Sequence, residues 1–449
     1  MSPVYVLGVG RTAYGRFPGL TVGALAGEAL ARALADAGCE LAGVDGVFFA
    51  NATQGALEGQ HLVRGQAALR DAGVEGVPVV NVENACASGA TALHLAATAV
   101  RAGDMDVALA VGAEKMYGAD EERLTAAFHG GLDVARWQEG LKALREAAGA
   151  DEAPPGRRSV FMDVYAALAA DHRRRHPACT PRALAAVTAK NRRHGALNPL
   201  AARRDALTVD EVLAAREVAA PLTVPMCAPI GDGAAAVLVC SAAAVRRLGA
   251  RRAVRLRADV VVSGTGRTLD EPERGITRRA SALAYERAGL GPVDVSVAEV
   301  HDATAVGEVL QAEALGLVPP GEGAVAAERG ETALGGRLPV NTSGGLESNG
   351  HPVGATGLGQ VHELVTQLRG EAGPRQVPGA RVGLAENGGG FLGFEEAAAA
   401  VLVLEAPAAG GPGMRRPATG SRDTEGRAAG GPGDGGPRGP EGPATGRAS

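Results

Sequence analysis

The sequence predicts an α/β protein made of two similarly organised halves, the first of which carries a largely helical insertion. Short apolar runs at 4–9, 43–51 and 106–115 are separated by amphipathic helices, a pattern typical of buried, parallel strands. The same order of strand and helix returns from about residue 253, which indicates a repeated unit. Between 117 and 224 this rhythm stops, and Arg- and His-rich helical stretches take its place.

The elements of the first half follow one another closely. The run VYVLGV is apolar and β-branched, which favours a strand directly at the N-terminus. The stretch 21–38 is an amphipathic helix closed by Gly38, the residue that best adopts the left-handed conformation after a helix. We expect further strands at 43–51, 77–82, 106–115 and 231–241, and a helix at 89–103.

The second half is expected to span 253–405, and the first half 1–252 with its insertion at 117–224. After Glu405 the composition changes, because the segment 406–449 contains no Leu, Ile, Val or aromatic residue. Such a segment cannot bury enough apolar surface to fold, so we expect a disordered, Gly/Pro-rich tail. The elements expected in the second half are a strand at 253–264, a helix ending at Gly289, a strand at 295–302, helices through 316 and at 357–370, and a closing strand pair at 381–387 and 396–405.

Charge and composition exclude several classes of protein. The net charge of −5 argues against a nucleic-acid partner. No apolar run approaches the roughly 20 residues that span a bilayer, and the first residues have no secretory pattern. The five cysteines show no CxxC spacing, so neither a disulfide framework nor a metal site is expected. We expect a cytoplasmic protein.

Cys86 lies where the strand 77–82 gives way to the helix 89–103. Unpaired N–H groups and the dipole at a helix N-terminus favour a thiolate, and small neighbours give a substrate carbonyl access. We therefore interpret Cys86 as a nucleophile at a tight turn. The alternative is a buried core cysteine.

His351 lies in the glycine-dense stretch NTSGGLESNGHPVGATGLGQ, residues 341–360. Glycines at this density let a backbone approach a ligand, and a histidine here could take the thiol proton or bind a thioester oxygen. The alternative is a flexible turn with an exposed histidine.

His301 and Asp302 lie where a strand ends and a helix begins, which is where open α/β sheets place ligands. The alternative for Asp302 is an N-cap of that helix; the two roles do not exclude each other.

Taken together, the motifs NACASGATALHLAA, CAPIGDGAAAVLV and NTSGGLESNGHPVGATG resemble the nucleophile, mid-chain strand and histidine motifs of the thiolase superfamily over residues 3–405. The motif HDAT at 301–304 is similar to the HDCF motif of sterol-carrier-protein-type and archaeal thiolases. The resemblance implies the thiolase fold, two βαβαβαββ halves in a five-layer αβαβα arrangement with an inserted loop domain.

The resemblance also implies roles for individual residues. Cys86 would be the acylated nucleophile, His351 would activate it, and His301 would hold a thioester oxygen. A backbone N–H near Gly389 would complete an oxyanion hole with the Cys86 amide. The residues expected to contact substrate are Asn341, Ser343, Gly344 and Gly350.

Two departures from the family pattern concern the group that moves the proton at the α-carbon. The loop where a thiolase usually has a second cysteine reads AENGGG, and position 303 of HDAT is alanine. Glu386 is a nearby carboxylate that could replace the missing cysteine; the alternative is that it points into solvent. A Cys/His/His set also resembles that of decarboxylating ketosynthases, in which no α-proton is removed.

We therefore expect a coenzyme A thioester-dependent C-acyltransferase with no permanently bound cofactor, acting on acyl-CoA or an acyl carrier protein. One alternative is a thiolase-like aldolase or specialised acyltransferase that works with a small OB-fold partner protein. Another is a non-catalytic acyl- or lipid-binding protein, which the intact Cys/His/His set argues against. The resemblance also implies a homodimer or a dimer of dimers, and no membrane partner is expected.

Overall fold

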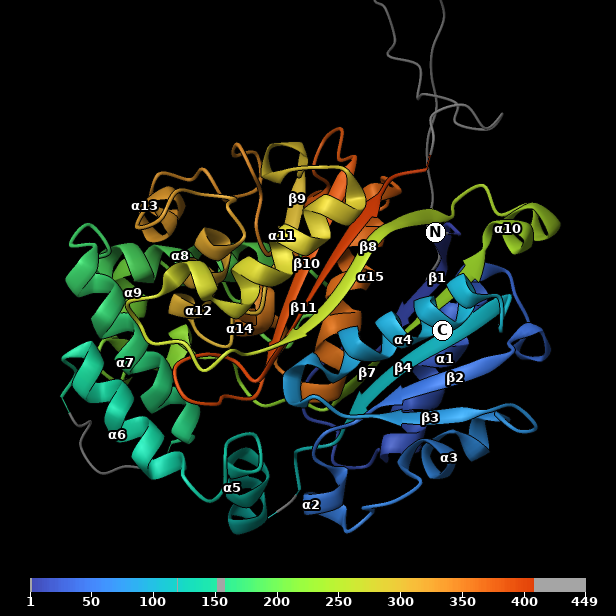
Figure 1. The fold of residues 1–449 in the computed structure, drawn as a ribbon, viewed down its shortest axis with the longest axis horizontal. Coiled ribbons are helices and arrows are strands. Elements are labelled where there is room, and N and C mark those ends of the chain that lie inside the picture. Colours follow the sequence, from blue (N-terminus) through green and yellow to red (C-terminus); the bar gives the residue numbers. More distant parts are fainter. Residues whose placement is uncertain (1, 119, 152–157, 408–449) are drawn as a thin grey trace, which may run out of the picture. The chain divides into compact units, whose positions relative to one another are not determined.

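The computed structural model describes residues 2–118, 120–151 and 158–407, so the expected tail lies almost entirely outside the described residues. The alternation of strands and helices expected from the sequence is confirmed (Figure 1). The strands are β1 (Val4–Arg11), β2 (Gly46–Ala50), β3 (Val79–Val82), β4 (Val107–Glu114), β5 (Glu217–Ala219), β6 (Leu222–Thr223), β7 (Gly233–Ser241), β8 (Val254–Ser263), β9 (Val297–Glu299), β10 (Val382–Gly389) and β11 (Ala398–Glu405).

The helices expected at 21–38, 89–103 and 357–370 are present as α1, α4 and α15, whereas the short helices α2, α3, α10, α13 and α14 were not expected. Gly38 ends α1 in the left-handed conformation, with φ of 61°, as expected for a glycine after a helix. The α-helices are α1 (Val22–Ala37), α2 (Gln54–Glu58), α3 (Arg64–Leu69), α4 (Ser88–Ala102), α5 (Glu121–His129), α6 (Trp137–Ala148), α7 (Val160–Arg175), α8 (Pro181–Ala196), α9 (Val209–Ala214), α10 (Ala242–Leu248), α11 (Ile276–Ala288), α12 (Ala305–Ala314), α13 (Gly323–Glu328), α14 (Gly345–Asn349) and α15 (Thr356–Leu368).

The two halves use the same strand order in opposite directions. Within the described residues, the large sheet runs β3-β2-β4-β7-β1-β8-β11-β10-β9. The first strands of the two halves, β1 and β8, pair antiparallel at its centre. A parallel bridge between Ala298 and Val340 lies beside β9, in the place that β3 occupies in the first half. The repeat expected from the pattern of elements is therefore a structural one, although the boundary between 252 and 253 stays a prediction.

The expectation of a parallel sheet holds only for its outer parts. Strand β2 pairs parallel with β3 and β4, and β9 pairs parallel with β10. The last strand of each half, β7 or β11, instead runs antiparallel to both of its neighbours. Apolar runs buried on both faces look alike in either direction, so strand composition does not distinguish the two cases.

Three apolar clusters show how the layers are stacked. The central cluster joins α4 and α15 to strand residues of both halves, including Leu93, Leu358 and Leu402. Helix α1 packs on the outer face of the first half, and α11 packs on the outer face of the second. If the strands of each half are taken as one layer, the order is helix, sheet, helix, sheet, helix, which is the expected five-layer arrangement. Helices α4 and α15 share the central layer, and their N-termini lie side by side.

The segment between β4 and β7 is largely helical, as expected, and its described residues contain α5 to α9 and the small β5–β6 hairpin. Its apolar cluster includes residues of α12 and Phe391, so the insertion packs on the second half near the end of β10. None of the described helices has both the length and the apolarity needed to cross a membrane.

Candidate active site

Cys86 lies in a strained 3₁₀ turn, Ala85–Ala87, between β3 and α4. Ala85 has φ of 47°, a left-handed conformation that costs a non-glycine residue roughly 1 kcal/mol. The Ser88 hydroxyl holds the turn, because it accepts from the Asn84 N–H (2.8 Å) and donates to the Ala85 carbonyl (2.6 Å). The thiol is partly exposed and lines a cavity, so the alternative of a buried core cysteine is wrong.

Glycines bring the His351 segment against the Cys86 helix. A Cβ on Gly89 would lie 2.8 Å from the Gly354 carbonyl oxygen, and one on Gly357 would lie 2.7 Å from the Ala90 nitrogen. Neither position can therefore carry a side chain. At Gly354 and Gly357 the approaching group is the protein's own backbone, whereas the sequence suggested a ligand.

His351 is oriented as a proton acceptor for Cys86. Its Nε2 lies 3.1 Å from the Cys86 Sγ, and its Nδ1 lies 2.8 Å from the Thr356 Oγ1. The Thr356 hydroxyl donates to the Pro352 carbonyl (3.2 Å), so it accepts from the Nδ1–H of His351. This hydrogen bond leaves the lone pair of Nε2 directed at the thiol. The alternative of an exposed histidine in a flexible turn is wrong.

His301 completes a compact group of three. Its ring centroid lies 5.3 Å from that of His351, and donor atoms of Cys86 and the two histidines all lie within 4.8 Å of one another. Neither ring nitrogen of His301 has a hydrogen-bond partner among the described residues, although the side chain is buried. Burial lowers the pKa of His301 to about 4, so a neutral imidazole is left to donate to a substrate oxygen.

Cys86 rests as a thiol, contrary to the thiolate expected from its place before a helix. Burial raises the pKa of Cys86 to about 12, and Glu114 adds to the rise, while the backbone N–H of Gly390 opposes it. Burial and His301 together hold the pKa of His351 well below its usual 6.5. Desolvation of the sulfur therefore outweighs the local dipole, and the pair rests as thiol and neutral imidazole.

This protonation state predicts a steep pH dependence for the chemical modification of Cys86. Alkylation by iodoacetamide is expected to accelerate about tenfold per pH unit from about pH 7 to 10, because only the thiolate reacts and its pKa lies above this range. Mass spectrometry of the intact protein would measure the rate, and Cys86→Ala would correct for the other cysteines. A plateau near neutral pH would show a resting thiolate instead.

The backbone donor expected near Gly389 is supplied by the next residue. The N–H groups of Gly390 and of Cys86 itself stabilise the charged sulfur. Gly389 permits this contact, since a Cβ there would lie 2.2 Å from the Asn84 carbonyl oxygen. The loop after β10 thus adds the Gly390 N–H to that of Cys86, and two N–H donors side by side are the kind of arrangement that stabilises a developing oxyanion.

Two expectations for acidic residues need correction. Glu386 is fully buried and its Oε2 accepts from the His301 N–H at 3.0 Å, so it does not point into solvent. It is also absent from the cavity wall. Asp302 does not cap α12, whose N-cap is Thr304; its carboxylate instead accepts from the Leu346 N–H at 2.7 Å.

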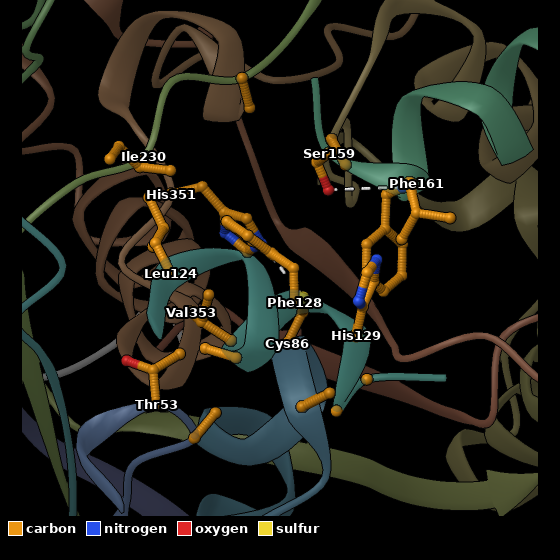
Figure 2. A pocket seen from close by; sticks show the side chains of 18 of the residues that line it. Thr53, Cys86, Leu124, Phe128, His129, Ser159, Phe161, Ile230, His351 and Val353 are labelled. Atoms are coloured by element: carbon orange, nitrogen blue, oxygen red, sulfur yellow. Dashed lines mark hydrogen bonds between the residues drawn. The ribbon is translucent and has the colours of Figure 1, made fainter. Parts of the chain in front are cut away.

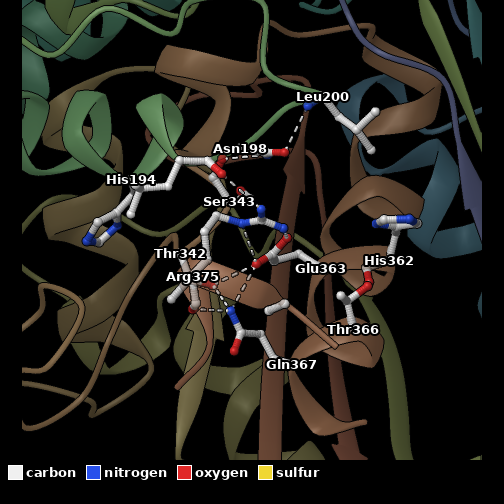
Figure 3. Close-up of polar contacts among 12 residues, drawn as sticks. His194, Asn198, Leu200, Thr342, Ser343, His362, Glu363, Thr366, Gln367 and Arg375 are labelled. Atoms are coloured by element: carbon white, nitrogen blue, oxygen red, sulfur yellow. Dashed lines mark hydrogen bonds and ion pairs between the residues drawn. The ribbon is translucent and has the colours of Figure 1, made fainter. Parts of the chain in front are cut away.

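The residues expected to contact substrate at 341–350 lie behind the cavity wall. Asn341 donates to the Glu308 carboxylate (2.8 Å), and the Ser343 hydroxyl donates to Glu299 (2.6 Å). Glycine is needed at Gly344, where a Cβ would lie 2.6 Å from the backbone of Gly195. Figure 3 shows Thr342 and Ser343 within the surrounding buried polar network. Asn341, Ser343, Gly344 and Gly350 do not line the cavity, so their geometry indicates support of the His351 loop.

A cavity of about 800 Å³ opens over the three residues. Figure 2 shows Phe128, His129 and Phe161, from the inserted segment, beside Cys86 and His351. Its volume is at the upper end of what small-molecule sites enclose. Its larger apolar lining residues are Leu124, Phe128, Val160, Phe161, Met162, Val218, Val224, Ile230, Val353 and Phe391.

Sequence reasoning missed most of the polar residues on this wall, and four of them matter below: Tyr165, Arg203, Cys227 and Glu396. Cys227 belongs to a motif already noted, and an antiparallel bridge to Thr304 places it beside the position where the family's HDCF cysteine would be. Nothing local in the sequence indicates that the other three face the site.

Within the described residues, one group of side chains has donor atoms close enough together to hold a metal ion: Cys86, His301 and His351. Thiolate and imidazole are zinc ligands, but a metal held here would occupy both the nucleophile and its base. The hydrogen bonds of His351 instead fit proton transfer from sulfur, and a site without metal stays our prediction.

The five-layer fold of two repeated halves, with a Cys/His/His site between them, defines the class of thiolase-like proteins. Comparisons with known families agree. The family described as "Thiolase, N-terminal domain" matches residues 4–243, and "Thiolase C-terminal domain-like" matches residues 268–405. The chain belongs to the thiolase family.

Several relatives are similar over most of the chain. Human "Sterol carrier protein 2" is 35% identical over 419 residues, covering 88% of this chain and 73% of the relative. An "Acetyl-CoA acetyltransferase" of Methanothermobacter thermautotrophicus is 37% identical, covering 88% and 98%. Among solved structures, the "Ltp2-ChsH2(DUF35) aldolase" has a TM-score of 0.73 at 22% identity, covering 90% of this chain and 98% of that one, a likeness that concerns the fold alone.

Proposed function

We propose that this protein transfers acyl groups from coenzyme A thioesters by way of an acyl-Cys86 intermediate and makes or cleaves a carbon–carbon bond next to a thioester. One observation carries the proposal. His351 Nε2 lies 3.1 Å from the Cys86 Sγ, with its tautomer fixed by Thr356. A thiol whose pKa is raised needs such a base at the moment of attack.

In the acylation step, Cys86 Sγ forms a bond to the thioester carbonyl carbon while its proton passes to His351. The carbonyl oxygen takes up the negative charge, which the N–H groups of Cys86 and Gly390 are placed to stabilise. The bond from carbon to the coenzyme sulfur then breaks, and His351 returns the proton to that sulfur. His301 remains to bind a second carbonyl oxygen, that of the incoming thioester.

The cavity also contains a group suited to an anionic substrate. Arg203 lies on its wall, and its guanidinium makes no hydrogen bond or ion pair with the described residues, although burial lowers its pKa. A guanidinium in this setting favours a phosphate or carboxylate partner. We assign it to a phosphate of coenzyme A, and the apolar remainder of the cavity to an acyl group larger than acetyl.

Mass spectrometry of the intact protein, incubated with acetyl-, butyryl-, octanoyl- and benzoyl-CoA, tests the proposal. A mass increase equal to the acyl group, lost on treatment with hydroxylamine and mapped to Cys86, is the expected result. Acylation at another residue, or none with the whole series, would exclude this function in favour of a binding protein.

A second candidate is an aldolase or specialised acyltransferase that needs an OB-fold partner. Two observations favour it: position 303 is alanine where HDCF enzymes have a cysteine, and a similar fold occurs in a structure whose title names an aldolase with a DUF35 component. Co-purification with a partner encoded beside the gene, and activity that requires it, would favour this candidate. Full activity of the chain alone would exclude it.

We also predict a homodimer through β3. This strand ends the sheet, and Val80 on it is 42% exposed, so its free edge can pair with a second copy. Sedimentation equilibrium should show a dimer that Val80→Lys weakens. Val293→Lys is the matched control, because Val293 is 95% exposed and lies in the second half. A monomeric wild-type protein that retains activity would contradict this prediction.

A further inference from the structure

The carbon–carbon step needs a base that Cys86, His301 and His351 do not supply. The proton on the carbon next to a thioester must leave while Cys86 carries the acyl group and His301 binds an oxygen. The base must also reach the cavity. The wall carries several titratable side chains besides the three site residues, among them Tyr165, Cys227 and Glu396.

Glu396 is held beside the loop that serves the nucleophile. It lies just before β11, and its Oε1 accepts from the Nε2 of Gln311 at 2.7 Å. Its Cγ packs on Gly388 near the end of β10, since a Cβ on Gly388 would lie 2.9 Å from it. Two residues further along the chain, in the loop after β10, Gly390 directs its N–H to the sulfur of Cys86. The carboxyl group is therefore fixed on the wall next to the nucleophile.

Glu386, the buried neighbour of Glu396, is not a second candidate for the base. Glu386 uses Oε2 to accept from the backbone of His301 and does not face the cavity. Burial, followed by the charge of Glu396, raises the pKa of Glu386 well above 4.5. A charge on one carboxylate disfavours a charge on the other, so this shift favours a proton on Glu386.

Two other residues of the cavity wall, Cys227 and Tyr165, are poor bases near neutral pH. Burial raises the pKa of Cys227 to about 12 and that of Tyr165 well above 10, so both keep their protons. Burial also raises the pKa of Glu396 above 4.5, which moves this carboxylate toward the range where a general base is most effective.

We propose that the Glu396 carboxylate is the acid/base that removes the proton from the carbon next to the thioester and returns it in the reverse reaction, an inference that rests on the proposed function. The C–H bond breaks, an O–H bond forms on Glu396, and the electron pair becomes the enolate of the thioester. The enolate carbon then bonds to the carbonyl carbon of acyl-Cys86, whose C–S bond breaks. The proton on Glu396 passes to the released sulfur, which restores the thiol and the carboxylate.

Exchange of deuterium from D₂O into the α-position of acetyl-, butyryl- and octanoyl-CoA measures this step without requiring acyl transfer. With the full chain, Glu396→Gln is expected to lower the exchange rate at least about 100-fold, the range for loss of a general base. Acylation of Cys86 should stay within about threefold of wild type, because that step uses His351. Glu396→Asp should restore part of the exchange with a shifted pH profile, and Glu328→Gln, on an exposed end of α13, is the matched control.

Three further variants separate Glu396 from Glu386 and from the other wall residues. Glu386→Gln should change exchange and acylation far less than Glu396→Gln changes exchange, because the amide oxygen of glutamine can still accept from the His301 N–H. The inference would be overturned if Glu396→Gln kept its exchange, if Cys227→Ala or Tyr165→Phe abolished exchange in its place, or if the wild-type protein exchanged none of the three thioesters.

Exchange is also measured in Cys86→Ala, which cannot be acylated. Persistent exchange there, lost in the double variant with Glu396→Gln, is the expected result. A wild-type protein that exchanges deuterium but never forms acyl-Cys86 would exclude the proposed function and leave the role of Glu396 standing. A protein that forms acyl-Cys86 but whose exchange does not depend on Glu396 would support the proposed function and exclude the role of Glu396.

Discussion

Cys86→Ala is expected to abolish acyl transfer completely while the protein remains folded. Among the described cysteines, Cys86 combines a place on the cavity wall with a histidine nitrogen at 3.1 Å. Cys179 also lies beside a histidine, His172, but it is buried and does not line the cavity, so it cannot take over the nucleophilic role. The structural cost is small, because the side chain is partly exposed on a cavity wall. We expect a loss of about 1 kcal/mol or less in the free energy of unfolding, since only one sulfur atom leaves the packing.

The measurement combines the acylation rate from intact mass with thermal unfolding. Cys39→Ala is the matched control, because Cys39 is also partly exposed and packs beside Gly43, outside the cavity lining. Turnover by a folded Cys86→Ala protein would end the covalent mechanism. Loss of the folded state in this variant alone would instead show that the turn at Ala85–Ala87 depends on the thiol.

His351→Gln is expected to slow acylation of Cys86 by about 10²- to 10⁴-fold, the usual contribution of a positioned general base. The amide cannot accept the thiol proton, and a thiol whose pKa is about 12 ionises too rarely without help. The effect should shrink at high pH, where solvent ionises the thiol directly. A rate deficit that is constant up to about pH 10 would show that His351 positions the substrate and does not accept the proton.

The tautomer of His351 gives a second test of the same step. Thr356→Val removes the acceptor for Nδ1–H and keeps the side-chain shape, so we expect a loss of about tenfold, equal to about 1.4 kcal/mol for one hydrogen bond. Thr356→Ser keeps the hydroxyl and should stay close to wild type. Equal losses in both variants would point to packing at the start of α15 and not to the tautomer.

Much of the fold could be predicted because its signals are local. Gly38 ends α1 where the pattern places a helix end, and the apolar runs of β1, β4 and β11 become strands. Strand direction was less accessible, since the antiparallel strands β7 and β11 are as buried and apolar as β2, which pairs parallel with β3 and β4. Direction depends on how the chain crosses from one edge to another, which strand composition does not record.

The sequence by itself determined the order of the main elements and the repeat, and it singled out Cys86, His301 and His351, whose donor atoms lie within 4.8 Å of one another in the structure. These depend on residue type at turns between strands and helices, where the local backbone already favours the conformation. It also showed that no cysteine stands at position 303 or in the loop 385–390.

Only the tertiary structure decided how these residues act. His351 meets Cys86 across 265 positions of the chain, and burial by both halves makes the nucleophile a thiol where the helix terminus alone favoured a thiolate. It also placed Glu386 behind His301 and Glu396 on the cavity wall. The desolvation of a side chain and the direction in which it points depend on every element packed around it, and no local stretch of sequence contains that information.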